Sequence, residues 1–147
     1  MCDYCYRIVV VRLKPITPKK LHRRIFSQLW MLALQFILGM MLNLIGNEAS
    51  GAKHTVYNVV LIAHIVNAIG LLEGGVFIAL KEQSKLSWWA TIFITITFCG
   101  GILTVLTKQD AWSFVMACSF LVSSCLYIVL YMRADRKIHD EELRAKP

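Results

Sequence analysis

The sequence predicts an all-α integral membrane protein, an antiparallel four-helix bundle with both termini in the cytoplasm. Three observations predict this fold. The chain is 57% hydrophobic, which is too much for an ordinary soluble domain. Its positive charge lies almost entirely on one side of four apolar runs. Each run supplies the roughly 20 helical residues that cross a bilayer, and the runs are residues 25–46, 55–80, 87–107 and 111–132.

The basic residues predict the orientation. Of the 16 Lys and Arg residues, only Lys53 and Lys108 lie in the first and third loops. Positively charged segments stay in the cytoplasm, so we expect residues 1–24, 81–86 and 133–147 on the cytoplasmic side of the cell membrane. The net charge of +7 then indicates anionic lipid, and not nucleic acid, as a partner. We expect lipid headgroups to contact Lys19, Lys20, Arg23 and Arg24.

The first apolar run continues a helix that begins before it. All four apolar runs are continuous and lack the alternation of apolar and polar residues that barrel strands show. This predicts that they are helices. Thr17 is a suitable N-cap and Pro18 a suitable first helical residue. Gly46 is typical of a helix C-terminus. We therefore expect a helix that starts at Pro18 and ends near Gly46.

The second and third runs are also expected to be membrane-spanning helices. Residues 55–80 form a long run that we expect to tilt in the bilayer. Trp88 and Trp89 begin the third run, at the level of the headgroups. The turn at residues 108–110 is very short, so the third and fourth runs are expected to be neighbours that run in opposite directions.

The fourth run ends in a charged tail. Trp112 marks its outer interface, and Tyr127 and Tyr131 approach the inner one. Residues 133–147 mix charges of both signs, which indicates a solvated helical extension.

Polar residues inside membrane spans are the first candidates for a functional site. In the second run, His64 and Asn67 fall on one helical face with the pair Gly74 and Gly75. Gly70 and Gly74 form a small-xxx-small pair, which lets a neighbouring helix approach while His and Asn bond across the gap. The candidate intramembrane polar site comprises His64, Asn67, Glu73, Gln35, Asn43 and Ser124.

His64 lies near the middle of its span and allows three interpretations. It is a neutral imidazole bonded to a neighbouring helix, a ligand for haem or a metal, or part of a proton relay. A bis-histidine haem needs a second histidine on a facing helix, and the first, third and fourth runs contain none. Haem at His64 is therefore kept only as an alternative.

Glu73 follows His64 by nine residues, which puts it on the opposite side of the helix. A charged carboxylate at the bilayer centre costs about 3 kcal/mol. Glu73 either pairs with a loop residue such as Lys81 or Lys85, or forms a proton- or cation-coupled site.

The remaining polar residues suggest partners for these groups. In the first run, Gln28 and Gln35 share a face, with Asn43 nearby. The fourth run has a stripe of residues at helical spacing that is typical of a packing seam between helices. Alternatively, this stripe lines a polar cavity between the first, second and fourth runs. The stripe consists of Ser113, Ala117, Phe120, Ser124, Tyr127 and Tyr131.

The cysteines do not predict a metal or redox centre. Cys2 and Cys5 form a lone CxxC pair, without the two further ligands that zinc needs or the strand and helix of a thioredoxin-like site. Cys99, Cys118 and Cys125 lie in spans, so we expect no disulfide framework. We assign no metal site and no catalytic residue, which favours a role other than that of an enzyme.

Three short segments carry a resemblance to known proteins. They are residues 38–44 in the first run, Ala63-His64 in the second and residues 113–117 in the fourth. Together they resemble a loosely defined group of small prokaryotic four-span membrane proteins with no assigned activity. The resemblance covers residues 20–133 and implies a four-helix membrane fold, without an active site.

These features favour an accessory or structural subunit of a membrane complex, in contact with a larger membrane assembly or with further copies of the chain. A first alternative is a small proton- or cation-coupled transporter or channel that uses Glu73. A second is a membrane redox module that binds haem or quinone at His64.

Overall fold

The computed structural model describes residues 16–46, 51–107 and 109–144, and within them it is helical with no strand. Each of its helices is long and apolar enough to cross a membrane. The predicted all-helical fold is therefore confirmed, with four helices that are able to span a membrane. The helices are α1 (Pro18–Ile45), α2 (Ala52–Glu82), α3 (Lys85–Thr107) and α4 (Asp110–Arg144).

The helix ends follow from local backbone chemistry. Thr17 is extended, with φ −67° and ψ 145°, and Pro18 opens α1 as predicted, although the Thr17 side chain makes no capping bond. Gly46 ends α1 with a φ of 70°, which glycine adopts without steric cost. Gln83 ends α2 in the left-handed region, and its N–H donates to the carbonyl of Ala79 at 3.0 Å.

One connection is shorter than predicted. The cytoplasmic loop predicted at 81–86 is only Gln83 and Ser84, because α2 and α3 extend into it. The Ser84 hydroxyl accepts a hydrogen bond from the Ser87 N–H at 3.1 Å, which satisfies an otherwise free donor at the start of α3. Beyond the fourth apolar run, α4 stays helical to Arg144.

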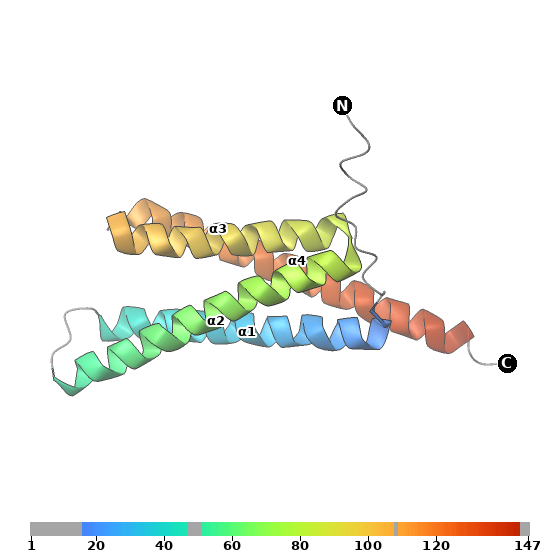
Figure 1. The fold of residues 1–147 in the computed structure, drawn as a ribbon, viewed down its shortest axis with the longest axis horizontal. Helices are drawn as coiled ribbons and strands as arrows, with labels where there is room; N and C mark the ends of the chain where they lie inside the picture. Colours follow the sequence, from blue (N-terminus) through green and yellow to red (C-terminus); the bar gives the residue numbers. More distant parts are fainter. Residues whose placement is uncertain (1–15, 47–50, 108, 145–147) are drawn as a thin grey trace, which may run out of the picture.

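The helices form a ring in which α1 packs on α2, α2 on α3, α3 on α4, and α4 on α1. In Figure 1 the chain runs leftward along α1, returns along α2, leaves again along α3 and returns along α4. The start of α1 therefore meets the far end of α4. There, the rings of His22 and Tyr131 lie 4.4 Å apart, and Lys19 forms a 3.2 Å salt bridge with Glu142.

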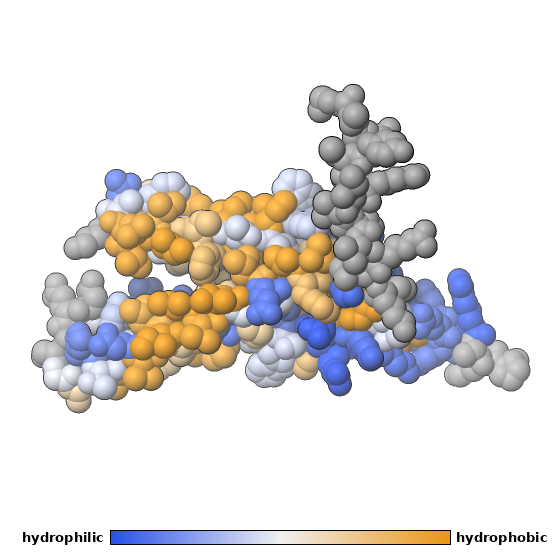
Figure 2. All heavy atoms as spheres, in the orientation of Figure 1, coloured by the Kyte–Doolittle hydropathy of each residue, from blue (hydrophilic) through white to orange (hydrophobic). Residues whose placement is uncertain are grey.

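The bundle has two halves that differ in packing. We call residues 18–35, 67–82, 85–99 and 118–134 the packed half, because it holds nearly all the buried side chains. The open half comprises residues 36–45, 52–66, 100–107 and 111–117. Of its described residues, only Val60 and Gly100 are buried. Figures 1 and 2 show the reason: at the left end of the view, the α1–α2 pair diverges from the α3–α4 pair.

Tyr127 lies at the centre of the packed half. Its side chain is fully buried, and its hydroxyl would lie 3.1 Å from a Cβ built on Gly75. Thr91 of α3 completes this contact by donating to the Gly75 carbonyl at 3.0 Å. Two segments distant in sequence thus make room for a ring that belongs to the predicted stripe of α4.

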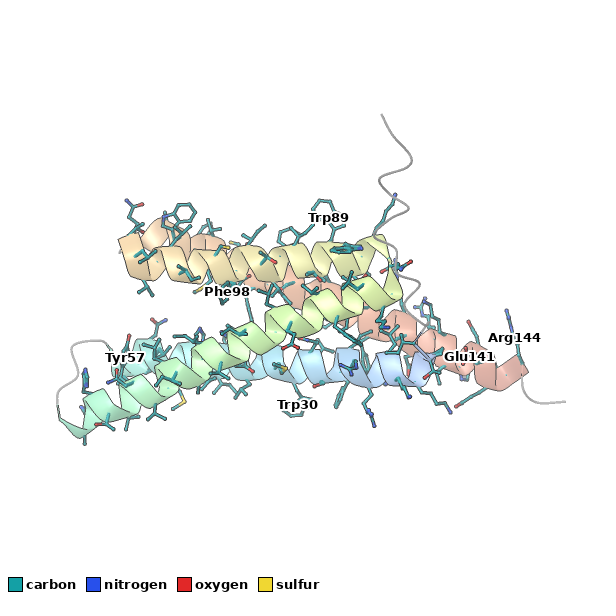
Figure 3. The ribbon with its side chains drawn as sticks, in the orientation of Figure 1. Trp30, Tyr57, Trp89, Phe98, Glu141 and Arg144 are labelled. Atoms are coloured by element: carbon teal, nitrogen blue, oxygen red, sulfur yellow. The ribbon has the colours of Figure 1, made fainter. Side chains whose placement is uncertain are left out.

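The outer surface is largely apolar, as lipid requires (Figure 2). Figure 3 shows Trp30 of α1 and Trp89 of α3 pointing away from the bundle on opposite sides. Both are exposed, Trp30 by 65%. The charged part of α4, with Glu141 and Arg144, projects past the start of α1 (Figure 3).

Candidate functional site: a polar cluster between α1 and α2

Three of the predicted polar residues meet between α1 and α2. Asn67 donates through its amide nitrogen to the Gln35 Oε1 at 2.7 Å and to the Met31 carbonyl at 2.9 Å. The Gln35 Nε2 lies 3.0 Å from the His64 Nε2. These three residues form what we call the polar cluster.

The bonding pattern assigns the tautomer of His64. Because the Gln35 oxygen accepts from Asn67, its amide nitrogen is free to donate to the imidazole. The His64 Nε2 is then the acceptor, and its proton is on Nδ1. That Nδ1 is buried and has no hydrogen-bond partner among the described residues. The imidazole is thus neutral, and only one of its two ring nitrogens has a hydrogen-bond partner among the described residues.

Helix geometry and small residues position the cluster. Gln35 continues the buried stripe of α1, and His64 and Asn67 lie one turn apart on α2. Gly39 leaves space for the imidazole, since a Cβ there would lie 3.5 Å from the His64 Cε1. The cluster therefore lies at the border of the two halves, where the side chains of α1 and α2 still interlock.

The glycines of α2 receive side chains of α1, as the small-xxx-small pattern predicts. A Cβ on Gly70 would come within 2.7 Å of the Met31 Cε. The Gln28 amide fills the space over Gly74 so fully that any Cβ there would overlap it. Gly75, predicted to share this face, instead faces Tyr127. The face of α2 is thus divided between α1 and α4.

The other three candidates lie apart from the polar cluster. Glu73 is exposed on another face of α2 and has no salt bridge among the described residues. Asn43 is exposed near the end of α1. The Ser124 hydroxyl donates at 2.8 Å to the Phe120 carbonyl of its own helix. The six residues therefore do not form one site.

Sequence reasoning missed one contribution to this region. The Met31 backbone carbonyl is a direct acceptor for Asn67, and no side-chain pattern reveals a carbonyl. Gln28, which the sequence places on one face with Gln35, is buried against Gly74.

The arrangement gives little basis for a metal or haem at His64. His54 bonds to Asn58 within α2, and His22 lies against Tyr131, so neither completes a pair with His64. The part of the chain that the structure describes contains no group of three His, Cys, Asp or Glu residues suited to a metal ion. Cys2 and Cys5 lie outside the described residues.

No protein-family model, curated protein or solved structure matches this chain. The chemistry of its own residues must carry the functional argument.

Proposed function

We propose that the chain is an accessory or structural subunit of a membrane complex in the cell membrane, with an antiparallel bundle and both termini in the cytoplasm. The one-sided distribution of Lys and Arg supports this orientation. The short connection between α2 and α3 is then cytoplasmic. Its flanking residues Lys81 and Lys85 lie at the same side as the basic start of α1.

One observation carries the role as a subunit: Glu73 faces outward from an apolar helix surface. Its neighbours on α2 include Ile69 and Val76, which are also exposed. Ionisable residues in membrane spans almost always face a bundle interior or pair with one another, because lipid does not solvate them. An outward carboxylate therefore needs a cationic partner that another chain supplies.

Among the described residues, no cation forms a salt bridge with Glu73. Arg24 lies with its guanidinium carbon 4.2 Å from the centre of the Phe77 ring, and the Lys81 Nζ lies 5.8 Å from the same centre. Neither forms a salt bridge with Glu73. We infer that the partner is a helix of another subunit with a Lys or Arg at the depth of Glu73.

The geometry gives less support to a carrier or a redox module. A carrier would need Glu73 and the interior polar groups to share a path, whereas they lie on different faces of α2. The hydrogen bonds among Gln35, His64 and Asn67 connect α1 to α2, as polar side chains do between packed membrane helices.

Topology can be tested directly. Reporters fused after Pro147 and inserted within residues 47–54 should read opposite sides of the membrane. Equal readings at the two sites would contradict the proposed orientation.

Subunit contact is tested with a photoreactive residue at Val76, close to Glu73, and a matched one at the similarly exposed Ile92 of α3. We expect a protein adduct at Val76, reduced about fivefold by Glu73→Gln, because the charge pair across the interface is lost. Ile92 should give lipid adducts. Glu141→Gln, which removes an exposed carboxylate from the α4 extension, should leave the adduct at Val76 unchanged.

The result also identifies the class of partner. An adduct of twice the chain's mass would make the assembly a homo-oligomer. If Val76 and Ile92 give only lipid adducts in native membranes, the proposed role is wrong. Proton or cation flux in liposomes that Glu73→Gln abolishes would favour the carrier instead.

A further inference from the structure

A pocket lies between the start of α1 and the end of α2; none of the polar cluster lines it, and Glu73 lies one helical turn before its Phe77. Its volume is about 570 Å³, and it is open to the outside. Four cationic side chains line it, together with the ring of Phe77. We call it the basic pocket, and its cations are Lys20, Arg23, Arg24 and Lys81.

Within the described part of the chain, no acidic side chain compensates the charge in the basic pocket. Among the described residues, none of its four cations forms a salt bridge, and no carboxylate lines it. Lys19, one residue away, differs because it pairs with Glu142 at 3.2 Å. Four like charges around one cavity repel each other, and a bound anion would relieve that repulsion.

Phe77 orients two of the cations. The guanidinium carbon of Arg24 lies 4.2 Å from the centre of its ring, and the Lys81 Nζ lies 5.8 Å from it. Stacking on an aromatic face stabilises a guanidinium and restricts its orientation. Arg24 can then present its planar N–H groups to a tetrahedral anion, and phosphate accepts two such hydrogen bonds from one guanidinium.

The backbone adds to the positive potential. Thr17, the residue before α1, lines the basic pocket, and the first turn of α1 contains no acidic residue. The N-terminus of a helix carries a partial positive charge. Backbone and side chains therefore favour an anion at the same place.

The position of the basic pocket indicates where that anion comes from. The first apolar run begins at Ile25, directly after Arg24, and the second ends at Leu80, directly before Lys81. The basic pocket thus lies where apolar surface gives way to charge, which is the depth of phospholipid phosphates. Leu80 of α2, one residue before Lys81, is an exposed apolar residue at this level.

We propose that the basic pocket is a binding site for the phosphate group of an anionic phospholipid. Arg24 and Lys81 hold the phosphate beside Phe77, and Lys20 and Arg23 add charge. Basic pockets between membrane helices on the cytoplasmic side are suited to such headgroups.

Native mass spectrometry of the whole chain in mild detergent tests this proposal, with phosphatidylglycerol and phosphatidylcholine as probes. We expect the first phosphatidylglycerol to bind about tenfold more tightly than phosphatidylcholine. The double variant Arg24→Gln/Lys81→Gln should abolish that preference. Lys19→Gln/Arg144→Gln removes the same charge outside the basic pocket and should preserve it. Circular dichroism would check that both variants keep their helices.

Three outcomes would overturn the proposal. Equal losses in the two double variants would mean that the whole basic end attracts lipid without a site. Binding of inorganic phosphate at millimolar concentration, in competition with the lipid, would make a soluble phosphate compound the ligand. If Arg24→Gln/Lys81→Gln unfolds, Lys20→Gln/Arg23→Gln tests the same pocket through two exposed side chains, and an unchanged lipid preference in that variant would also refute the site.

Discussion

The packed and open halves differ in how closely their helices approach each other. In the packed half, large side chains such as Tyr127 and Gln28 lie against the glycines of α2. In the open half, α1 and α2 stay together, as do α3 and α4, but the two pairs separate (Figure 1). Leu44, near the end of α1, is 81% exposed.

This difference shows what holds membrane helices together. Lipid tails are as apolar as leucine, so apolar surface alone gives two helices no reason to associate. Close contact comes from side chains that fit a space on the neighbouring helix. Glycines provide such a space between all four helices in the packed half, and only within each pair in the open half, as where Gly100 faces Met116.

The largest expected effect is the loss of the Tyr127 side chain. Tyr127→Ala leaves a cavity where three helices meet, and we expect it to lower the free energy of unfolding by about 3–5 kcal/mol. The matched variant Phe114→Ala, in the open half, removes a ring that is 72% exposed and should cost under about 1 kcal/mol. Unfolding in mixed detergent micelles measures both. Equal losses would erase the distinction between the halves.

A smaller effect is expected from an added methyl group at Gly75. A Cβ there would lie 3.1 Å from the Tyr127 hydroxyl, so Gly75→Ala should destabilise by about 1–2 kcal/mol through overpacking. In the open half, Gly39→Ala would bring a Cβ to 3.5 Å from the His64 Cε1, an ordinary contact. Thermal unfolding should therefore be unchanged by Gly39→Ala. A loss there as large as that at Gly75 would show that the open half is packed just as closely.

The smallest effect concerns the border between the halves. Asn67→Ala removes hydrogen bonds to Met31 and Gln35, and such bonds between membrane helices contribute about 0.6–1.7 kcal/mol. Asn58, in the open half, bonds only to His54 of its own helix, so Asn58→Ala should be nearly neutral. Combining Asn67→Ala with Gln35→Ala should cost less than the sum of the two, since they share a bond. Strict additivity would contradict the network.

The sequence predicts the spans well because length and apolar composition decide them. It also predicts the close approach of α1 to Gly70 and Gly74, since residue size and helical spacing are local properties. The sequence does not reveal which residues surround Tyr127, because the space around it is made by Gly75 and Thr91, which no local pattern connects to α4.

The candidate site was only partly predictable for the same reason. Asn67 and His64 were expected to bond across a helix contact, and they do so through Gln35. The divergence of the two helix pairs was not foreseen, because the runs are equally apolar along their length. The basic residues were expected at the headgroups, but only the fold brings Arg24 and Lys81 to one aromatic ring.

The divergence of the two helix pairs also determines the cross-section of the protein at each depth in a bilayer. A bundle that is narrow at one end and wide at the other takes up unequal areas in the two leaflets. Flexible acyl chains adapt to such a wedge, so a change in leaflet crowding or curvature would act on the wide end first.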